Sequence, residues 1–96
     1  MSYSLRFMPS ALKEWQRLDN SIREQFKAVL AQRLITPRVS SAALHNMPDC
    51  YKIKLRQVGY RLVYQVHDNI VTVEVIAVGK REKSSVYRQA MRRLEL

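Results

Sequence analysis

The sequence predicts an α+β fold: a two-helix hairpin packed on a mostly antiparallel four-stranded sheet, followed by a C-terminal helix. Three observations predict it. Apolar residues recur at helical spacing between residues 9 and 36. Apolar and basic residues alternate from Tyr51 to Arg56, as on a strand with one buried face. Short turn-forming stretches then separate further apolar runs, which is typical of antiparallel hairpins.

The N-terminal third predicts one strand and two helices. Apolar and polar residues alternate over residues 2–7, the pattern of a short strand. Pro9 suits the first position of a helix, where a missing amide hydrogen costs nothing, and we expect that helix over 9–18. A turn at 19–21 supplies the N-cap of a second helix, which ends before Pro37.

The remaining chain predicts three strands and a last helix. After a connection over 37–48, we expect strands at 50–56, 60–66 and 71–78, separated by turns at 57–59 and 67–70. Gly79 is expected to break the last strand. A charged loop at 80–83 and a helix capped by Ser84 or Ser85 then follow. Trp15 and Phe26 lie at core spacing and are expected to anchor the helix hairpin on the sheet.

The register of the strands follows if Val58-Gly59 and Asp68-Asn69 are two-residue loops. The predicted pairs are then Arg56 with Arg61, Lys54 with Val63, Lys52 with Gln65, Arg61 with Ile76, Val63 with Glu74, and Gln65 with Thr72.

This register divides the sheet into two faces. The polar, cationic face carries Lys52, Lys54, Arg56, Arg61, Gln65, Thr72 and Glu74. The apolar face, expected under the helix hairpin, carries Tyr51, Ile53, Leu55, Tyr60, Leu62, Tyr64, Val66, Val71, Val73, Val75 and Ala77. Like charges opposed across two strands are destabilising without an anion, so the cationic face favours an anionic ligand.

Composition limits the kind of protein. Ninety-six residues predict a single domain over 1–96, with no room for a second. No apolar run approaches the roughly 18 residues of a membrane span, and the N-terminus lacks the apolar core of a signal peptide, so we expect a cytoplasmic protein. The single cysteine, Cys50, has no metal-ligand spacing around it, and we expect no metal and no cofactor.

Charge is the informative part of the composition. Seventeen Lys and Arg against eight Asp and Glu give a net charge of +9 at pH 7, which favours a polyanionic partner, nucleic acid first and an acidic protein second. Such a surface can bind a phosphate backbone. It can also cleave RNA if it supplies a base for the 2′-hydroxyl, cations for the phosphorane and an acid for the leaving 5′-oxygen. From residue types alone, binding ranks ahead of cleavage.

A lysine among other cations has a lowered pKa and is a usable base near neutral pH. Lys52 and Lys54 point from one strand to the same face, with Arg61 nearby, so we expect at least one of them to titrate below its ordinary value. A tyrosine, for which Tyr87 is the candidate, offers a ring on which a base can stack.

Several strings in the chain resemble the RelE toxins of bacterial toxin–antitoxin pairs: MPDCYKIKLR, GYRLVYQV, VGKRE followed by VY, and LKEW in the first helix. The resemblance runs from the first strand to the last helix. It implies an endoribonuclease that enters the ribosomal A site and cuts the mRNA codon there by 2′-hydroxyl attack, leaving a 2′,3′-cyclic phosphate. It also implies a RelB-like antitoxin that displaces or blocks the C-terminal helix, and a toxin–antitoxin complex that binds operator DNA.

The resemblance carries residue roles with it. It implies catalytic roles for Lys52, Lys54, Arg61, Arg81 and Tyr87: the lysines as base and charge stabilisers, Arg61 on the phosphate, Arg81 as the acid, and Tyr87 orienting the codon. It also implies contacts with mRNA or rRNA from His45, Arg56, Lys80 and Lys83.

One position departs from the family's best-known member, which has arginine where this chain has His45. His45 is either a weaker, pH-dependent RNA contact or a loop residue, and the loop interpretation is favoured. Two other functions remain open. One is a noncatalytic toxin of the same superfamily that acts on DNA gyrase, and the other is a basic module that binds nucleic acid or an acidic antitoxin.

Overall fold

The computed structural model describes residues 2–82 and 84–96. Its elements are β1 (Ser4–Phe7), α1 (Pro9–Gln16), α2 (Asn20–Arg33), η1 (Ser40–Ala42), β2 (Cys50–Leu55), β3 (Tyr60–His67), η2 (Asp68–Ile70), β4 (Thr72–Lys80) and α3 (Ser85–Arg93). Within the described residues, every helix is too short or too polar to cross a membrane.

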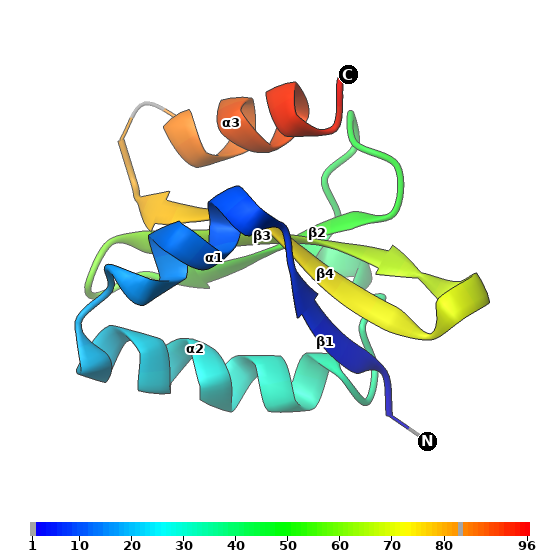
Figure 1. Cartoon of the computed structure of the whole chain (residues 1–96), viewed down its shortest axis with the longest axis horizontal. Coiled ribbons are helices and arrows are strands. Elements are labelled where there is room, and N and C mark those ends of the chain that lie inside the picture. Colours follow the sequence, from blue (N-terminus) through cyan, green and yellow to red (C-terminus); the bar gives the residue numbers. More distant parts are fainter. Residues whose placement is uncertain (1, 83) are drawn as a thin grey trace.

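The strands form one sheet in the order β1-β4-β3-β2. β1 runs parallel to β4, and the β2–β3 and β3–β4 pairs are antiparallel. The α1–α2 hairpin packs on one face of this sheet and α3 lies across the other, as Figure 1 shows. The predicted α+β class, the mostly antiparallel sheet and the C-terminal helix are therefore confirmed.

The helix hairpin is anchored as the apolar spacing predicts. Phe26 of α2 is fully buried and Trp15 of α1 is 9% exposed. The Trp15 ring lies 5.1 Å from the Phe7 ring and 6.1 Å from the Phe26 ring, measured between centroids. These contacts join β1, α1 and α2 into one core with the sheet.

The predicted register of the first hairpin is wrong by two residues. Lys54 pairs with Arg61, not with Val63, because the loop has four residues, 56–59, instead of two. Gly59 closes this loop: its amide donates to the Leu55 carbonyl at 2.9 Å, and its φ of 72° is one that glycine adopts without strain. A shift of two residues leaves every side chain on its predicted face. The remaining predicted pairs are replaced by Lys52 with Val63 and Cys50 with Gln65.

The second hairpin also differs, because its loop has four residues, 68–71, instead of two, and because β4 contains a β-bulge. Val63 pairs with Ala77 and Tyr64 pairs with Val75, which leaves Ile76 as the extra residue of β4. The loop lies at 68–71, one residue later than the predicted turn at 67–70. β4 continues to Lys80, so the predicted break at Gly79 is wrong. Arg61 pairs with Gly79, Gln65 with Glu74 and His67 with Thr72 in place of the predicted partners.

The bulge reverses the alternation of β4. Ala77, predicted under the helix hairpin, instead lies in the cluster beneath α3, and Val78 takes its place on the hairpin side. Val71, also predicted in the core, is 41% exposed, because it lies in the loop with a φ of 49°.

A second apolar cluster lies beneath α3, on the face predicted to be polar. It consists of Met47, Cys50, Val63, Ile76, Ala77, Val86 and Ala90. α3 therefore covers part of the cationic face and leaves the Lys54–Arg61 end of it open.

Candidate functional site

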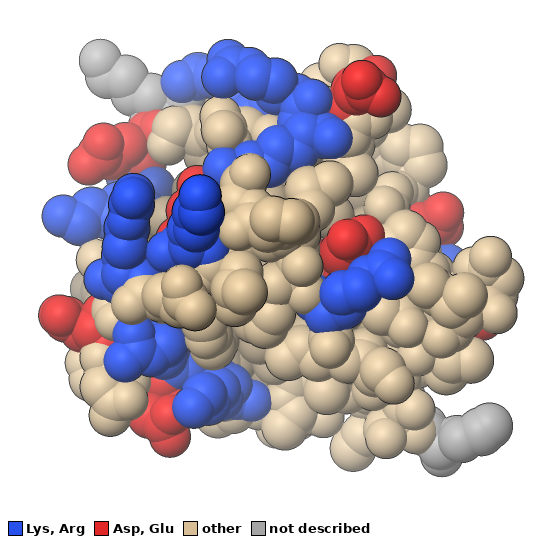
Figure 2. Space-filling view, in the orientation of Figure 1, with Lys and Arg blue, Asp and Glu red and all other residues tan. Residues whose placement is uncertain are grey.

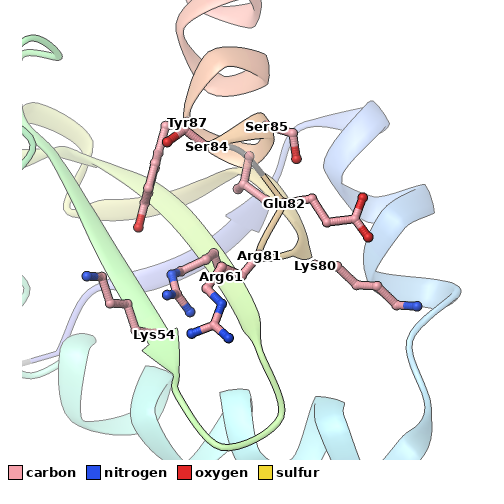
Figure 3. Close-up of a pocket in the computed structure, with 9 residues that line it drawn as sticks. Lys54, Arg61, Lys80, Arg81, Glu82, Ser84, Ser85 and Tyr87 are labelled. Carbon is pink, nitrogen blue, oxygen red and sulfur yellow. The ribbon is translucent and has the colours of Figure 1, made fainter.

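A cavity of about 240 Å³ opens where β2, β3 and the end of β4 meet the start of α3. Figure 3 shows its lining residues as sticks. They are Lys54, Arg61, Lys80, Arg81, Glu82, Ser84, Ser85, Val86 and Tyr87. Four residues predicted as catalytic, Lys54, Arg61, Arg81 and Tyr87, thus surround one space.

Arg61 is the buried cation of this cavity. It is only 8% exposed, and its guanidinium donates to the Tyr60 carbonyl at 3.2 Å. None of the described residues forms an ion pair with it. A buried charge without a counter-charge is costly, and an anion entering the cavity would remove that cost.

Lys54 stands directly across the β2–β3 pair from Arg61. Desolvation lowers the pKa of Lys54, and the positive charges of Lys52, Arg56 and Arg61 lower it further. The expectation that one lysine titrates below its ordinary value is confirmed for Lys54. A lysine with a lowered pKa is neutral more often at a given pH, so it can accept a proton.

Tyr87 lies on the first turn of α3, and its hydroxyl end points toward Lys54 and the two arginines (Figure 3). Its hydroxyl oxygen is buried and has no hydrogen-bond partner among the described residues. Leaving such a group unpaired costs about 1–3 kcal/mol. The hydroxyl is therefore placed to hydrogen-bond a ligand in the cavity.

Arg81 follows β4 directly and is exposed. Its backbone amide donates to the Gly59 carbonyl at 2.7 Å, which ties the β2–β3 loop to the end of β4. This contact holds the Arg81 side chain beside Arg61, whereas Lys80 and Glu82 extend to the opposite side (Figure 3). The predicted RNA contact of Lys80 thus lies at the rim, away from Lys54 and Tyr87.

Three further predicted residues, Lys52, Arg56 and His45, lie outside the cavity lining. Lys52 is half-buried on the same strand as Lys54, and its carbonyl accepts a hydrogen bond from Arg33 of α2 at 3.2 Å. Arg56 is exposed in the β2–β3 loop, and His45 is exposed in a turn. Lys83 lies outside the described residues.

Sequence reasoning missed Glu82, Ser84, Ser85 and Val86 as lining residues. Ser84 and Ser85 were expected only to cap the last helix, although the N-terminal end of a helix favours anions through its free amide groups. That property, together with their place three and four residues after Arg81, was the available signal.

Positive charge is unevenly spread over the surface. Figure 2 shows Lys and Arg gathered over α3 and along one side of the molecule, with wide uncharged regions on the other side. Within the described residues, no group of three His, Cys, Asp or Glu side chains is placed to hold a metal ion.

Comparison with known proteins places this geometry in a family. Residues 5–84 match the family described as ParE toxin of the type II toxin–antitoxin system parDE. The chain is 55% identical over 94 residues to the mRNA interferase toxin RelE of Escherichia coli K12, covering 98% of this chain and 99% of that protein. It is 50% identical to a putative RelE-like toxin protein of E. coli, with the same coverage of both chains.

Solved structures agree with the sequence comparison. A variant of the E. coli toxin RelE in the free state superimposes with a TM-score of 0.90 at 54% identity, covering 98% of this chain and 99% of that one. RelE in the intact E. coli RelBE toxin–antitoxin complex gives a TM-score of 0.82 at 55% identity, covering 85% of this chain and 100% of that one. The identity to curated RelE proteins over nearly the full length of both shows the family: this chain belongs to the RelE toxins of type II toxin–antitoxin systems.

Proposed function

We propose that this chain is an mRNA interferase, the toxin of a type II toxin–antitoxin pair, and that it cuts mRNA in the ribosomal A site. The observation that carries the proposal is the cavity. Within it lie a buried Arg61 and a Tyr87 hydroxyl, which have no counter-charge and no hydrogen-bond partner among the described residues, and a Lys54 with a lowered pKa. Relatives 55% identical to this chain carry the name mRNA interferase RelE, which supports the same activity here.

The proposed reaction uses the nucleophile that RNA carries. Neutral Lys54 takes the proton of the 2′-hydroxyl, and the resulting oxygen attacks the adjacent phosphorus. Arg61 binds the non-bridging oxygens of the phosphorane. Its electrostatic interaction with them is stronger than in water, because Arg61 is buried. Arg81 acts as the acid and donates a proton to the 5′-oxygen as its bond to phosphorus breaks. The products are a 2′,3′-cyclic phosphate and a 5′-hydroxyl.

Tyr87 and Lys52 assist in this proposal. The Tyr87 hydroxyl donates a hydrogen bond to the RNA, and its ring orients the codon. Lys52 adds positive charge beside Lys54 and is the second candidate for the base. Arg56, Lys80, Lys83 and His45 contact RNA outside the reacting phosphate.

The ribosome's role follows from how open the site is. Arg81 is exposed, and the cavity opens to solvent, so the protein alone has little surface to hold three nucleotides in line. We propose that the ribosomal A site holds the codon in the required geometry. In-line placement is worth several orders of magnitude in rate.

The partners follow from the charge and from the relatives. Two of the solved E. coli relatives are complexes, one with the antitoxin RelB and one with a peptide of it. We propose a RelB-like antitoxin for this chain, whose net charge of +9 favours an acidic partner, and operator DNA as the target of the joint complex. We further propose that residues 1–96 act as one toxin domain in the cytoplasm, without a cofactor.

Primer extension on an mRNA in a translation reaction tests the function. Cuts within A-site codons are expected with the parent protein, and Lys54→Ala and Arg81→Ala should reduce them strongly. Lys27→Ala removes the same charge from an exposed α2 position paired with Glu24, so its cutting should match the parent. If Lys27→Ala reduces cutting as much as Lys54→Ala does, overall charge and not the cavity determines the activity.

A second candidate function has one observation in its favour: the matching family is described as ParE toxin. Noncatalytic action on DNA gyrase is therefore the second hypothesis. It ranks below the interferase because it gives no role to Lys54, Arg61, Arg81 and Tyr87. DNA breaks that depend on gyrase, without mRNA cuts, would establish it in place of the interferase. Binding to the antitoxin alone, with neither kind of cut, would favour a basic interaction module.

A further inference from the structure

The C-terminal end of α3 is held by an ion pair whose two residues lie outside the cavity lining. Both guanidinium nitrogens of Arg93 donate to the Glu14 carboxylate of α1, at 2.8 and 2.9 Å. Arg93 also donates to the Ile76 carbonyl of β4 at 2.8 Å. Its side chain is 13% exposed and that of Glu14 is 30% exposed, so solvent screens this pair less than a surface pair.

This ion pair lies beside the part of β4 that follows the end of its pairing with β1. β1 pairs with β4 only as far as Phe7 opposite Val75, and the Met8 amide then donates to the Val75 carbonyl at 3.0 Å. Beyond that point the chain leaves the sheet to form α1. The Val78 amide donates to Glu14 at 3.2 Å, and the Ile76 carbonyl accepts from Arg93. The two side chains thus satisfy backbone groups that a longer β1 would otherwise have paired.

The rest of α3 contacts the sheet through one apolar face. Val86 and Ala90 of this nine-residue helix are buried, and Tyr87, Met91 and the following Leu94 are half-buried against the same apolar cluster. The buried hydroxyl of Tyr87 has no partner among the described residues, and burying it opposes the docking of the helix. The Glu14–Arg93 pair adds to these apolar contacts a polar contact that fixes the C-terminal end of α3.

Tyr87 precedes Arg93 by six residues, about 9 Å along the helix axis at 1.5 Å per residue. Both residues belong to one short rigid helix, so fixing one end fixes the other. When α3 leaves the sheet, Tyr87 leaves Lys54 and Arg61, whereas these two stay on β2 and β3. The cavity then loses one wall but keeps its cations.

We propose that Glu14 and Arg93 are positioning residues for the reaction: their ion pair holds α3 so that Tyr87 stands over Lys54 and Arg61. This inference rests on the proposed function. It predicts that breaking the pair lowers the rate of the chemical step much more than the ribosome affinity, because Lys54 and Arg61 lie on β2 and β3 and stay in place when α3 moves.

The test compares Glu14→Gln and Arg93→Gln with the parent in single-turnover cleavage of mRNA on programmed ribosomes. Each should lower the maximal rate by about tenfold or more, as expected if one molecule in ten keeps α3 docked. The dissociation constant for the ribosome should stay within about twofold, since Arg61 and its neighbours are intact. Arg92→Gln is the matched control: it removes the same charge one residue away, where Arg92 contacts only Gln89 among the described residues.

Two further measurements separate positioning from general destabilisation. In a Tyr87→Ala background, Arg93→Gln should cause no further loss of rate, because the side chain it positions is already absent. Amide hydrogen exchange should accelerate in α3 and stay unchanged in β2 and β3. Arg93→Lys keeps the charge and should restore part of the rate.

Each outcome decides one of the two proposals. If the parent does not cut mRNA on ribosomes, the proposed function fails, and the exchange of α3 amides still shows whether the pair holds the helix. If the parent cuts and both variants cut at its rate, the positioning role is refuted. Equal losses in the Tyr87→Ala background, or equally faster exchange throughout the sheet, would also refute it.

Discussion

At the scale of single residues, the cavity keeps groups in states that are unfavourable without a ligand. Arg61 is a buried cation, Lys54 faces it across the β2–β3 pair, and the Tyr87 hydroxyl is unpaired within the part of the chain that the structure describes. Each of these features raises the free energy of the folded protein without a ligand. A phosphate near the two cations, or a sugar hydroxyl bonded to Tyr87, would remove that cost. Substitutions that remove these groups should therefore stabilise the fold while they impair its activity.

Tyr87 gives the clearest case. Tyr87→Phe removes the unpaired hydroxyl and keeps the ring, so the free energy of unfolding should rise by about 1 kcal/mol. Urea unfolding measures this change. Single-turnover cleavage by the same variant should fall if the hydroxyl contacts the RNA, and stay near the parent rate if only stacking matters.

Tyr87→Ala serves as the comparison, because it removes ring and hydroxyl together. It should lose most of the rate under either role. A Tyr87→Phe variant that unfolds more easily than the parent would show that the hydroxyl has a partner in solution.

Lys54 couples stability to pH. Its pKa is lowered in the folded protein, so the folded state binds its proton less tightly than the unfolded chain does. The resulting penalty is fully present below the folded pKa and disappears as the pH rises past the unfolded value of about 10.4. Lys54→Met should therefore raise the melting temperature at pH 7, and the gain should shrink toward pH 10.

The same substitution tests the base. If Lys54 accepts the proton, the acidic limb of the pH–rate profile should vanish in Lys54→Met. If that variant keeps the parental rate and profile, Lys54 is not the base, and Lys52 becomes the candidate. A lower rate with an unchanged profile would make Lys54 a charge stabiliser.

At the scale of elements, the helix hairpin and the cavity depend on different parts of the chain. α2 packs through Ile22, Phe26 and Leu30, none of which contacts the cavity. Phe26→Ala should lower the free energy of unfolding by roughly 3–5 kcal/mol, the usual cost of emptying a fully buried aromatic position. Denaturant unfolding measures it, and an unchanged midpoint would contradict the burial of this face.

Local patterns predicted the elements well and their register poorly. The alternation of Tyr51, Ile53 and Leu55 determines which face is buried, and a two-residue slip does not alter it. Loop length is not visible in such a pattern, so Val58-Gly59 was interpreted as a tight turn although four residues form the loop. The bulge at Ile76 also has no local signal, because apolar residues occupy both faces of β4 there.

The candidate site was largely predictable because its residues lie within a few strings of the sequence. The resemblance to RelE toxins supplied Lys54, Arg61, Arg81 and Tyr87, which do share a cavity. The burial of Arg61 and of the Tyr87 hydroxyl was not predicted, since it depends on how α3 lies on the sheet. The Glu14–Arg93 pair joins residues 79 positions apart, a separation at which no sequence pattern operates.

At the scale of the whole molecule, charge should control association with the ribosome. The net charge is +9, and Lys and Arg gather on part of the surface (Figure 2). Binding that neutralises phosphates releases counterions, so affinity for ribosomes should fall steeply between about 50 and 200 mM salt. Filter binding over that range measures the slope. Affinity independent of salt would remove the electrostatic basis of the interaction.

The single cysteine gives this protein a built-in chemical reporter. Cys50 is 2% exposed and belongs to the apolar cluster beneath α3, and burial raises the pKa of its thiol to about 12. A thiol reagent should therefore react with it only when that cluster opens. The labelling rate then measures how often the C-terminal helix lifts away, in an unmodified protein and without any added probe. We expect Arg93→Gln to raise the labelling rate and Arg92→Gln to leave it unchanged. The labelling rate of Cys50 thus measures how often the apolar cluster beneath α3 becomes open to another molecule.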